Sequence, residues 1–299
     1  MTPSSSTAIR LAAGAVAEVV WLGDERASDP ALTGGKAANL SRLAAAHRVP
    51  PGFVLTVPGA TLPRHLRGLV AAAYRRLGEL TGTPDAPVAV RSSAVDEDGV
   101  DASFAGQHDT FLGISGPDAV WWVVARCFAS FGADRALGYR RANGLAAAPA
   151  RVAVLVQWLV PADASGVVFS ANPVTGARDE AVVDASWGLG ESIVGGAVTP
   201  DTWRIAHDGL AIRERRIADK RRMTVAAGGG AREVPVPGRL ARMPSLDDAR
   251  ARRAAALALE LEREMGWPVD LEVAWAGDDL FLLQCRPVTT LDRTPRSPR

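Results

Sequence analysis

One stretch, residues 270–286, constrains the fold more than any other, because polar and apolar side chains alternate on both sides of a turn. The alternation predicts two antiparallel strands, and the Gly-Asp-Asp sequence between them predicts a hairpin with a three-residue loop. In that register Glu272 lies opposite Gln284, and Asp270 lies opposite Arg286. Because side chains alternate along a strand, we expect these four polar groups on one face. The other face is expected to pack in a core through Leu271, Val273, Trp275, Phe281, Leu283 and Cys285.

Four polar groups beside an apolar floor can bind a purine nucleotide. A carboxylate and an amide hold Mg²⁺, and a guanidinium takes phosphate charge. The floor for a ring would come from the residues nearer the turn on that face, Ala274, Ala276, Leu280 and Leu282. The alternative is structural: an ion pair and a hydrogen bond on an amphipathic hairpin. A one-residue shift in register would separate the four groups, and the hairpin alone leaves both interpretations open.

Strand-like and helix-like segments are interleaved along the rest of the chain, which favours an α+β or mixed α/β fold. Helices are expected over residues 37–46 and 62–80. The triplet Gly228-Gly-Gly230 is expected to break regular structure, and Ser245-Leu-Asp-Asp248 resembles a helix capping box. Short strands are expected at Val88–Arg91, Val152–Val156, Gly166–Ser170 and Ala181–Asp184.

Lysine is rare in this chain. Only Lys36 and Lys220 occur among the 34 Lys and Arg residues. Arginine is a planar fork and lysine a compact point charge, so the two are not interchangeable at a tight site. Both lysines are therefore candidates for a function, although codon bias with two chance survivors is the alternative.

Three segments could contact phosphate. The Gly34–Lys36 segment stands at a predicted helix start, where N–H groups and the helix dipole suit an anion; a glycine-tolerant turn explains it equally well. Arg91 follows an apolar strand and could grip phosphate bidentately, unless it is an ordinary surface arginine. A loop of small residues contains Ser103, Gly106 and His108, and its backbone could approach a polyphosphate closely.

Taken together, these segments resemble the ATP-binding domain of phosphoenolpyruvate synthase, pyruvate phosphate dikinase and rifampin phosphotransferase. The likeness covers roughly residues 20–290 and follows the order of the family. It rests on Gly34-Gly-Lys36, Val90-Arg91-Ser-Ser-Ala94, Ser103-Phe-Ala-Gly106, Val156-Gln157, Gly166-Val-Val-Phe-Ser-Ala-Asn-Pro-Val-Thr-Gly176, Gly188-Leu-Gly-Glu191 and Asp270-Leu-Glu272 with Gln284-Cys-Arg286-Pro287.

The resemblance implies an α+β, ATP-grasp-like fold with mixed or antiparallel sheets, whose two lobes close on Mg-ATP. Residues 20–150 would form a first lobe with the phosphate-binding segments. Residues 151–290 would form a second lobe with the adenine- and Mg-binding strands. Outside the range of the resemblance, composition predicts a partly disordered N-terminal tail over residues 1–19 and a disordered tail over residues 291–299.

The resemblance also implies roles for single residues. Lys36 and Arg91 would hold the phosphates of ATP, and Arg286 would contact the transferred phosphate. Glu272 and Gln284 would bind Mg²⁺, with Asp270 beside them. The remaining nucleotide contacts would come from the segment around the first lysine, the small-residue loop, the expected adenine strand and scattered positions of the second lobe: Gly34, Gly35, Ser103, Gly106, Gln157, Glu191, Lys220 and Leu282.

The family's phosphate-accepting histidine lies in a small-residue setting that none of the four histidines, His47, His65, His108 and His207, shares. We therefore expect an ATP-dependent, dikinase-type phosphotransferase component that transfers the β-phosphate of ATP to a histidine on a separate protein or domain, leaving AMP and phosphate. One alternative is a stand-alone small-molecule kinase or an ATP-grasp ligase, which would leave ADP. The other is a non-catalytic or truncated nucleotide-binding module.

Charge and cysteine content limit the partners and the compartment. The formal net charge is +1, which gives no electrostatic case for nucleic acid or an anionic membrane. Two cysteines cannot form a disulfide framework, so a reducing cytoplasm is the expected location. The apolar segment Leu11–Leu22 contains Glu18 and is too short to cross a bilayer.

Overall fold

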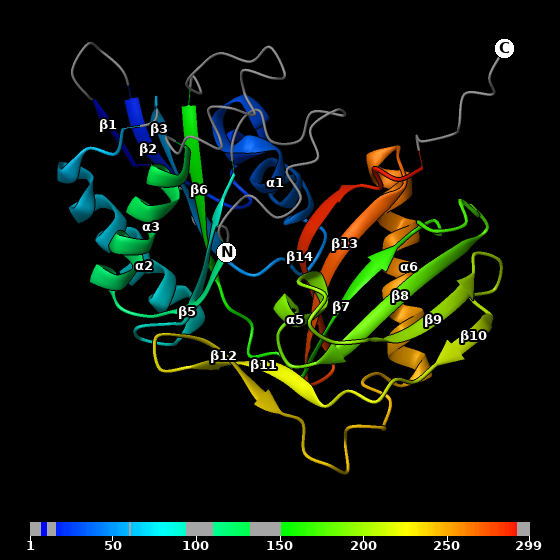
Figure 1. Cartoon of the computed structure of the whole chain (residues 1–299). Helices are drawn as coiled ribbons and strands as arrows, with labels where there is room; N and C mark the ends of the chain where they lie inside the picture. Colours follow the sequence, from blue (N-terminus) through cyan, green and yellow to red (C-terminus); the bar gives the residue numbers. More distant parts are fainter. Residues whose placement is uncertain (1–6, 11–15, 60, 94–109, 132–150, 292–299) are drawn as a thin grey trace, which may run out of the picture. The chain divides into compact units, whose positions relative to one another are not determined.

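The computed structural model describes residues 7–10, 16–59, 61–93, 110–131 and 151–291. The chain divides into two units (Figure 1). The first unit runs to Leu159 and includes Ala226–Ala231, and the second contains Val160–Val225 and the residues from Arg232 on. Each unit contains one six-stranded sheet.

The first sheet has the strand order β1-β2-β3-β6-β4-β5, and every neighbouring pair is antiparallel. Strand β6 pairs with both β3 and β4, so it belongs to this sheet. The boundary between the units thus follows Leu159, nine residues later than the lobe boundary expected after residue 150. The strands are β1 (Thr7–Arg10), β2 (Val16–Trp21), β3 (Gly52–Pro58), β4 (Val88–Ser92), β5 (Thr110–Ile114) and β6 (Arg151–Trp158).

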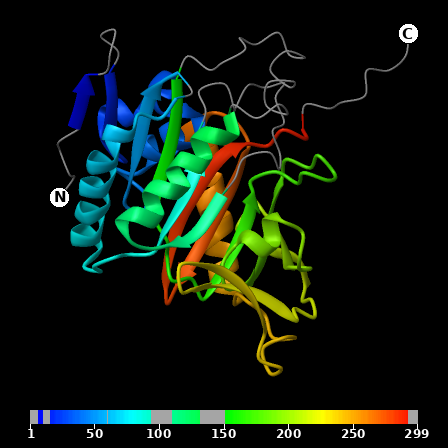
Figure 2. The same ribbon diagram turned by 60° about the vertical axis from the view of Figure 1, so that its left-hand side comes forward.

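Helices cover both faces of the first sheet (Figures 1 and 2). Helices α2 (Arg67–Thr81) and α3 (Pro117–Phe131) form a core with the alternate strand residues that include Phe53, Leu55 and Val154. Helix α1 (Pro30–Leu43) lies on the opposite face, where Thr56 Oγ1 donates a hydrogen bond of 2.7 Å to Leu32 O. Short 3₁₀ turns precede two of these helices, η2 (Glu25–Ser28) and η3 (Arg64–Leu66).

The second sheet has the order β10-β9-β8-β7-β13-β14 and is also antiparallel throughout. Helix α6 (Asp248–Met265) packs against one face of it (Figure 1). Trp203 is fully buried on that face, and its Nε1 donates to Asp248 Oδ1 at the start of α6. The strands are β7 (Ala164–Phe169), β8 (Glu180–Trp187), β9 (Asp201–Ala206), β10 (Ile212–Arg216), β13 (Val269–Ala276) and β14 (Asp279–Pro287), and a short helix α5 (Glu191–Val194) follows β8.

One local expectation is confirmed and one is wrong. The expected glycine break is a turn at residues 228–229, which joins strands β11 (Arg222–Ala227) and β12 (Gly230–Pro235) of a two-stranded sheet. Helix α6 is capped by Asp247, whose side chain accepts from Arg250 N. Ser245 forms no capping box, because its hydroxyl and N–H both donate to Asp201 Oδ2.

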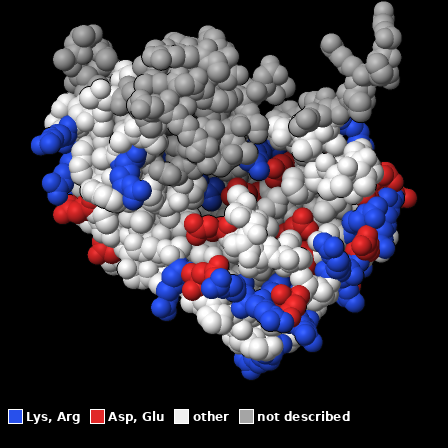
Figure 3. All heavy atoms as spheres, in the orientation of Figure 1, with Lys and Arg blue, Asp and Glu red and all other residues white. Residues whose placement is uncertain are grey.

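The α+β class is confirmed, and both large sheets are antiparallel. Among the described helices, none combines the length and the apolar character needed to cross a bilayer. Acidic and basic side chains are interspersed on the face shown in Figure 3. Exposed side chains of opposite charge form ion pairs, such as Arg204 with Glu214 and Arg215 with Asp248.

Candidate functional site

The C-terminal hairpin brings together the four polar residues expected from the sequence. Asp270 pairs with Arg286, and Glu272 pairs with Gln284, as the predicted register requires. Opposed residues of an antiparallel pair project to the same face. Leu271 is in register, across β7 and β8, with Trp203, whose side chain contacts α6. Leu271 therefore faces α6, and its neighbours Asp270 and Glu272 face away from that helix.

The register prediction fails nearer the turn. A β-bulge follows Glu272, so that Val273 lies opposite Leu282 and the strands are joined by two residues instead of three. The extra residue is Leu283, and it reverses the facing of the strand beyond it. Leu282 is therefore on the side of Val273 and is only 1% exposed. The expectation that Leu282 lies on the face of Glu272 is wrong.

The Asp270–Arg286 pair is partly buried. Arg286 Nε donates to Asp270 Oδ2 at 2.8 Å, and the arginine side chain remains 42% exposed. Burial raises the pKa of Asp270, although Arg286 opposes that effect. The other oxygen, Asp270 Oδ1, is buried and accepts no hydrogen bond from the described residues. A bound cation would satisfy that oxygen.

The donor set fits a magnesium ion. Mg²⁺ commonly takes one or two carboxylates and completes its shell with phosphate oxygens and water. Glu272 and Asp270 supply carboxylates on one face, and Gln284 supplies an amide. No group of three or more His, Cys, Asp or Glu side chains suited to a metal occurs among the described residues. A site at the hairpin would therefore need oxygen ligands from a bound molecule.

In the first unit, the structure brings the Gly34–Lys36 segment against the end of strand β4. Helix α1 is interrupted at Gly34, whose φ of 77° and ψ of 159° are not helical, so Lys36 lies in the first turn of the following helical segment. A Cβ on Gly34 would lie 2.3 Å from Ser93 O. Ser93 Oγ donates to Thr33 O at 2.7 Å. Only glycine permits this approach together with a positive φ.

Arg91 and Gln157 lie on one face of the first sheet, and helix α1, which carries Lys36, packs on that face. Arg91 pairs with Leu155, two residues before Gln157 on β6, and α1 packs on the same side. Lys36 and Arg91 are both partly exposed. Gln157 is 2% exposed, and its Nε2 donates to Pro50 O at 3.1 Å. The amide of Gln157 thus has a structural partner, and contact with adenine stays a prediction.

Lys220 has a structural environment. Its side chain is 0% exposed, and Nζ donates to Asp201 Oδ1 at 2.6 Å and to Ala218 O at 3.1 Å. Asp201 also accepts from Ala218 N and from Ser245. The ammonium is enclosed by these groups, which contradicts the expected contact with a nucleotide. A fully buried charge requires a partner of opposite charge, and Asp201, which is distant only along the sequence, supplies it.

The remaining expected residues fall into two groups. Glu191 is exposed at the start of α5, directly after Gly190. Ser103, Gly106 and His108 lie outside the described residues.

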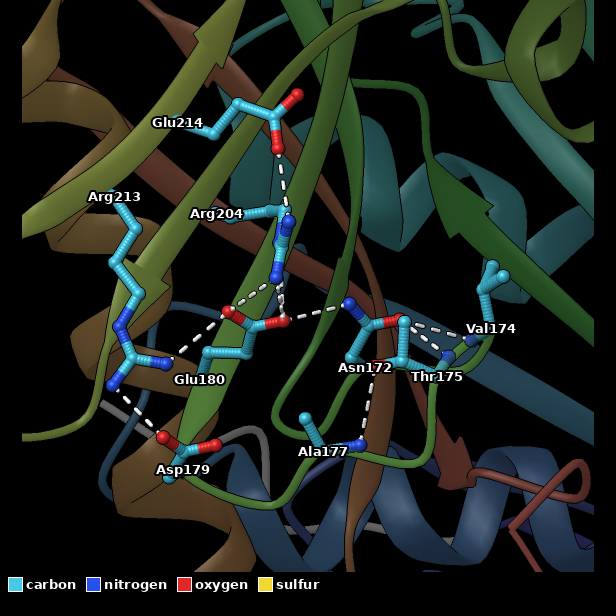
Figure 4. A network of polar contacts seen from close by, with 9 residues as sticks. All are labelled: Asn172, Val174, Thr175, Ala177, Asp179, Glu180, Arg204, Arg213 and Glu214. Atoms are coloured by element: carbon cyan, nitrogen blue, oxygen red, sulfur yellow. Dashed lines mark hydrogen bonds and ion pairs between the residues drawn. The ribbon is translucent and has the colours of Figure 1, made fainter.

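A polar network that the sequence did not reveal surrounds Glu180, and Figure 4 shows the residues that form it. The register places Glu180 on the same face of the second sheet as Asp184 and therefore as Glu272. Glu180 is fully buried and accepts from Arg204, Arg213 and Asn172. Burial raises the pKa of Glu180, but the hydrogen bonds from Asn172 and Arg204 outweigh it and hold the pKa below its usual value. The network orders the turn after Asn172. The Oδ1 atom of Asn172 accepts hydrogen bonds from the backbone N–H groups of Val174 and Thr175.

Comparison with known proteins identifies the family. Residues 56–298 match the family described as "Pyruvate phosphate dikinase, AMP/ATP-binding domain". A rifampicin phosphotransferase from Streptomyces sviceus is 42% identical over 81% of this chain and 27% of its own length. A probable phosphoenolpyruvate synthase from Methanocaldococcus jannaschii is 34% identical over 92% of this chain and 27% of its own. The prodigiosin synthesizing transferase PigC from Serratia marcescens is 36% identical over 91% and 33%.

The chain thus spans about a quarter to a third of the length of these relatives. Among solved structures, the D-alanine–D-alanine ligase of Bacillus anthracis complexed with ATP has a TM-score of 0.35 and 8% identity, covering 89% of this chain and 58% of its own. That score is too low to support any conclusion. The family match and the sequence relatives establish that this chain belongs to the pyruvate phosphate dikinase AMP/ATP-binding domain family.

Proposed function

We propose that this chain binds Mg-ATP and passes the β-phosphate of ATP to a histidine of another domain or protein. In the overall reaction, ATP, histidine and water give AMP, phosphate and phosphohistidine. Family membership supports ATP as the ligand. Relatives named as a rifampicin phosphotransferase and a probable phosphoenolpyruvate synthase support phosphate transfer as the chemistry. An ATP-grasp-like fold and a cytoplasmic location are parts of the same proposal.

One observation carries the proposal: the hairpin presents two carboxylates, an amide and a guanidinium on the face away from α6. In the proposed complex Glu272 and Gln284 would hold Mg²⁺, and the unpaired oxygen of Asp270 would be a further oxygen donor for it. When bound, Mg²⁺ neutralises charge on the phosphate oxygens. Arg286, more than a third exposed, takes charge on the transferred group.

Lys36 and Arg91 would complete the phosphate contacts. Transfer of a phosphoryl group requires mainly positioning and charge neutralisation, which cationic side chains and Mg²⁺ supply. The close contact between Gly34 and Ser93 links the segment that carries Lys36 to the strand that carries Arg91. The backbone segments that carry the two cations are thereby held together on one face of the first sheet.

Product analysis tests the proposal. The full chain is incubated with Mg-ATP, with and without a phosphohistidine-domain protein of a relative, and nucleotides are separated by chromatography. We expect AMP, together with an acid-labile phosphate on the histidine protein, only when both proteins are present. ADP as the product would favour the stand-alone kinase or ligase instead. Bound but unchanged ATP in both mixtures would favour the non-catalytic module.

A matched pair of variants ties the activity to the hairpin. Glu272→Gln removes one carboxylate from the proposed metal site and is expected to lower AMP formation about 100-fold or more. Glu260→Gln makes the same chemical change on an exposed position of α6 and is expected to leave the rate unchanged. Equal rates in the two variants would exclude Glu272 from the reaction.

A further inference from the structure

One row of opposed residues crosses all six strands of the second sheet, on the face away from α6. Glu272 and Gln284 stand at one end of this row, and Asp184 stands two strands from Glu272, on β8. Adjacent strands are about 4.8 Å apart, so the Asp184 and Glu272 backbones are roughly 10 Å apart. In strand order the row consists of Gln284, Glu272, Val167, Asp184, Thr202 and Arg216.

Asp184 is held in a fixed orientation by its neighbour. Thr202 Oγ1 donates a hydrogen bond of 2.6 Å to Asp184 Oδ1. Asp184 Oδ2 receives no hydrogen bond from the described residues. Burial raises the pKa of Asp184, whereas the Thr202 hydrogen bond and the charge of Arg216 lower it. One oxygen is thus committed to the protein, and the other can accept a donor from a ligand.

A second observation marks the same place. Ser186 lies two residues along β8, so its side chain is on the same face as that of Asp184. It is fully buried, and its Oγ has no hydrogen-bond partner among the described residues. Ser165, its cross-strand neighbour, is by contrast satisfied by donating to Gly188 O at 2.8 Å. Buried hydroxyl groups in proteins nearly always have a partner, so Ser186 indicates a missing one.

The chemistry of the row limits which part of a nucleotide can face Asp184. A carboxylate repels phosphate, so the group at this position must be an uncharged donor. In Mg-ATP the ribose hydroxyls are the donors nearest to the metal-bound phosphates. Val167 lies between Glu272 and Asp184 and offers an apolar surface for the carbon atoms of a sugar ring.

We propose that Asp184 and Ser186 form a subsite for the ribose hydroxyls of the nucleotide, with Asp184 Oδ2 accepting a hydrogen bond from the sugar. This inference rests on the proposed function, because it requires ATP to lie along the row from Glu272. It assigns Asp184 a role in selecting ribonucleotides over deoxyribonucleotides.

Calorimetric titration of the full chain tests the subsite. Mg-ATP, Mg-2′-deoxy-ATP and Mg-3′-deoxy-ATP are compared as ligands. A hydrogen bond to a charged acceptor contributes enough to change affinity about tenfold or more. We therefore expect at least one deoxy analogue to bind about tenfold more weakly than ATP. In Asp184→Ala the preference should fall to roughly threefold or less, through weaker binding of ATP and not through tighter binding of the analogue.

Two further variants complete the design. Asp208→Ala, at an exposed position of the turn between β9 and β10, is the matched control and should keep the preference of the wild type. Ser186→Ala removes one hydroxyl group with little change in volume. It should weaken ATP binding a few-fold and leave unchanged the affinity for the deoxy analogue that binds more weakly than ATP. This variant provides the test if Asp184→Ala does not fold.

The outcomes separate this inference from the proposed function. No binding of any nucleotide by the wild type would contradict the proposed function itself. Tight binding of ATP with equal affinity for both deoxy analogues would overturn the ribose subsite alone. The subsite is also overturned if Asp184→Ala keeps the sugar preference and instead loses its response to Mg²⁺, because Asp184 would then act on the metal.

Discussion

The two lysines of this chain lie in opposite environments. Lys36 is partly exposed, in the first turn after the glycine that interrupts α1. The ammonium of Lys220 is fully enclosed and bonded to Asp201 and Ala218. Rarity of lysine predicts positions where a guanidinium does not fit. It does not separate a cation kept for a ligand from one kept for a buried aspartate, and only the surroundings decide between them.

The largest effect on stability is expected at Lys220. Lys220→Met leaves the Asp201 carboxylate buried with its main charged partner removed, and breaking a buried ion pair typically costs about 3–5 kcal/mol. Urea denaturation should show that loss in the free energy of unfolding. The neighbouring Arg221→Met, which removes an exposed ion pair with Asp219, serves as the control and should cost less than about 1 kcal/mol. If Lys220→Met instead kept its stability and lost nucleotide binding, Lys220 would be a ligand-binding residue and not a structural one.

Gly34→Ala should have the second largest effect, and we expect it mainly on ATP binding and less on global stability. The Cβ would meet the Ser93 carbonyl at 2.3 Å, and the backbone already has a positive φ. Strain of this kind costs on the order of 1–3 kcal/mol, and it acts where α1 approaches β4. We expect ATP affinity to fall by at least tenfold while the global unfolding transition moves only modestly. Gly68→Ala, in α2 with open space around it, should stabilise the chain by up to about 1 kcal/mol.

Glu180 gives a pH-dependent effect of intermediate size. Its pKa is lower in the folded protein than in the unfolded chain, so its stabilising contribution is complete above the unfolded pKa of about 4.5 and is lost as pH falls through the folded value. Glu180→Gln should therefore cost about 2 kcal/mol at neutral pH. The gap to the wild type should close in acid. Urea denaturation at pH 7 and at successively lower pH measures the difference in the free energy of unfolding; a difference that stays constant down to acid unfolding would contradict the assignment.

Lys36 should affect stability least. Lys36→Met is expected to change the free energy of unfolding by less than about 0.5 kcal/mol, as for most substitutions of partly exposed residues. Binding of Mg-ATP, measured by the same titration as for the wild type, should weaken by about tenfold or more because one phosphate contact is lost. A stability loss as large as that of Lys220→Met, with ATP binding intact, would make both lysines structural.

Much of the hairpin could be predicted because its information is local. Alternation with a period of two places Asp270 and Glu272 on one face, and a short turn places Gln284 and Arg286 opposite them. The bulge after Glu272 could not be predicted, because the extra residue, Leu283, fits the same alternation until the two strands are paired. A single residue thus moved Leu282 from the expected ligand face to the core.

The sequence by itself determined the family and the four polar groups of the hairpin, since these depend on the order of residues along a few turns or strands. Only the tertiary structure decided the partner of Lys220, which lies nineteen residues away in Asp201, and the row that joins Asp184 to Glu272 across β7. Pairing between distant segments depends on how strands are ordered in a sheet. No short-range pattern specifies that order, because every strand alternates in the same way.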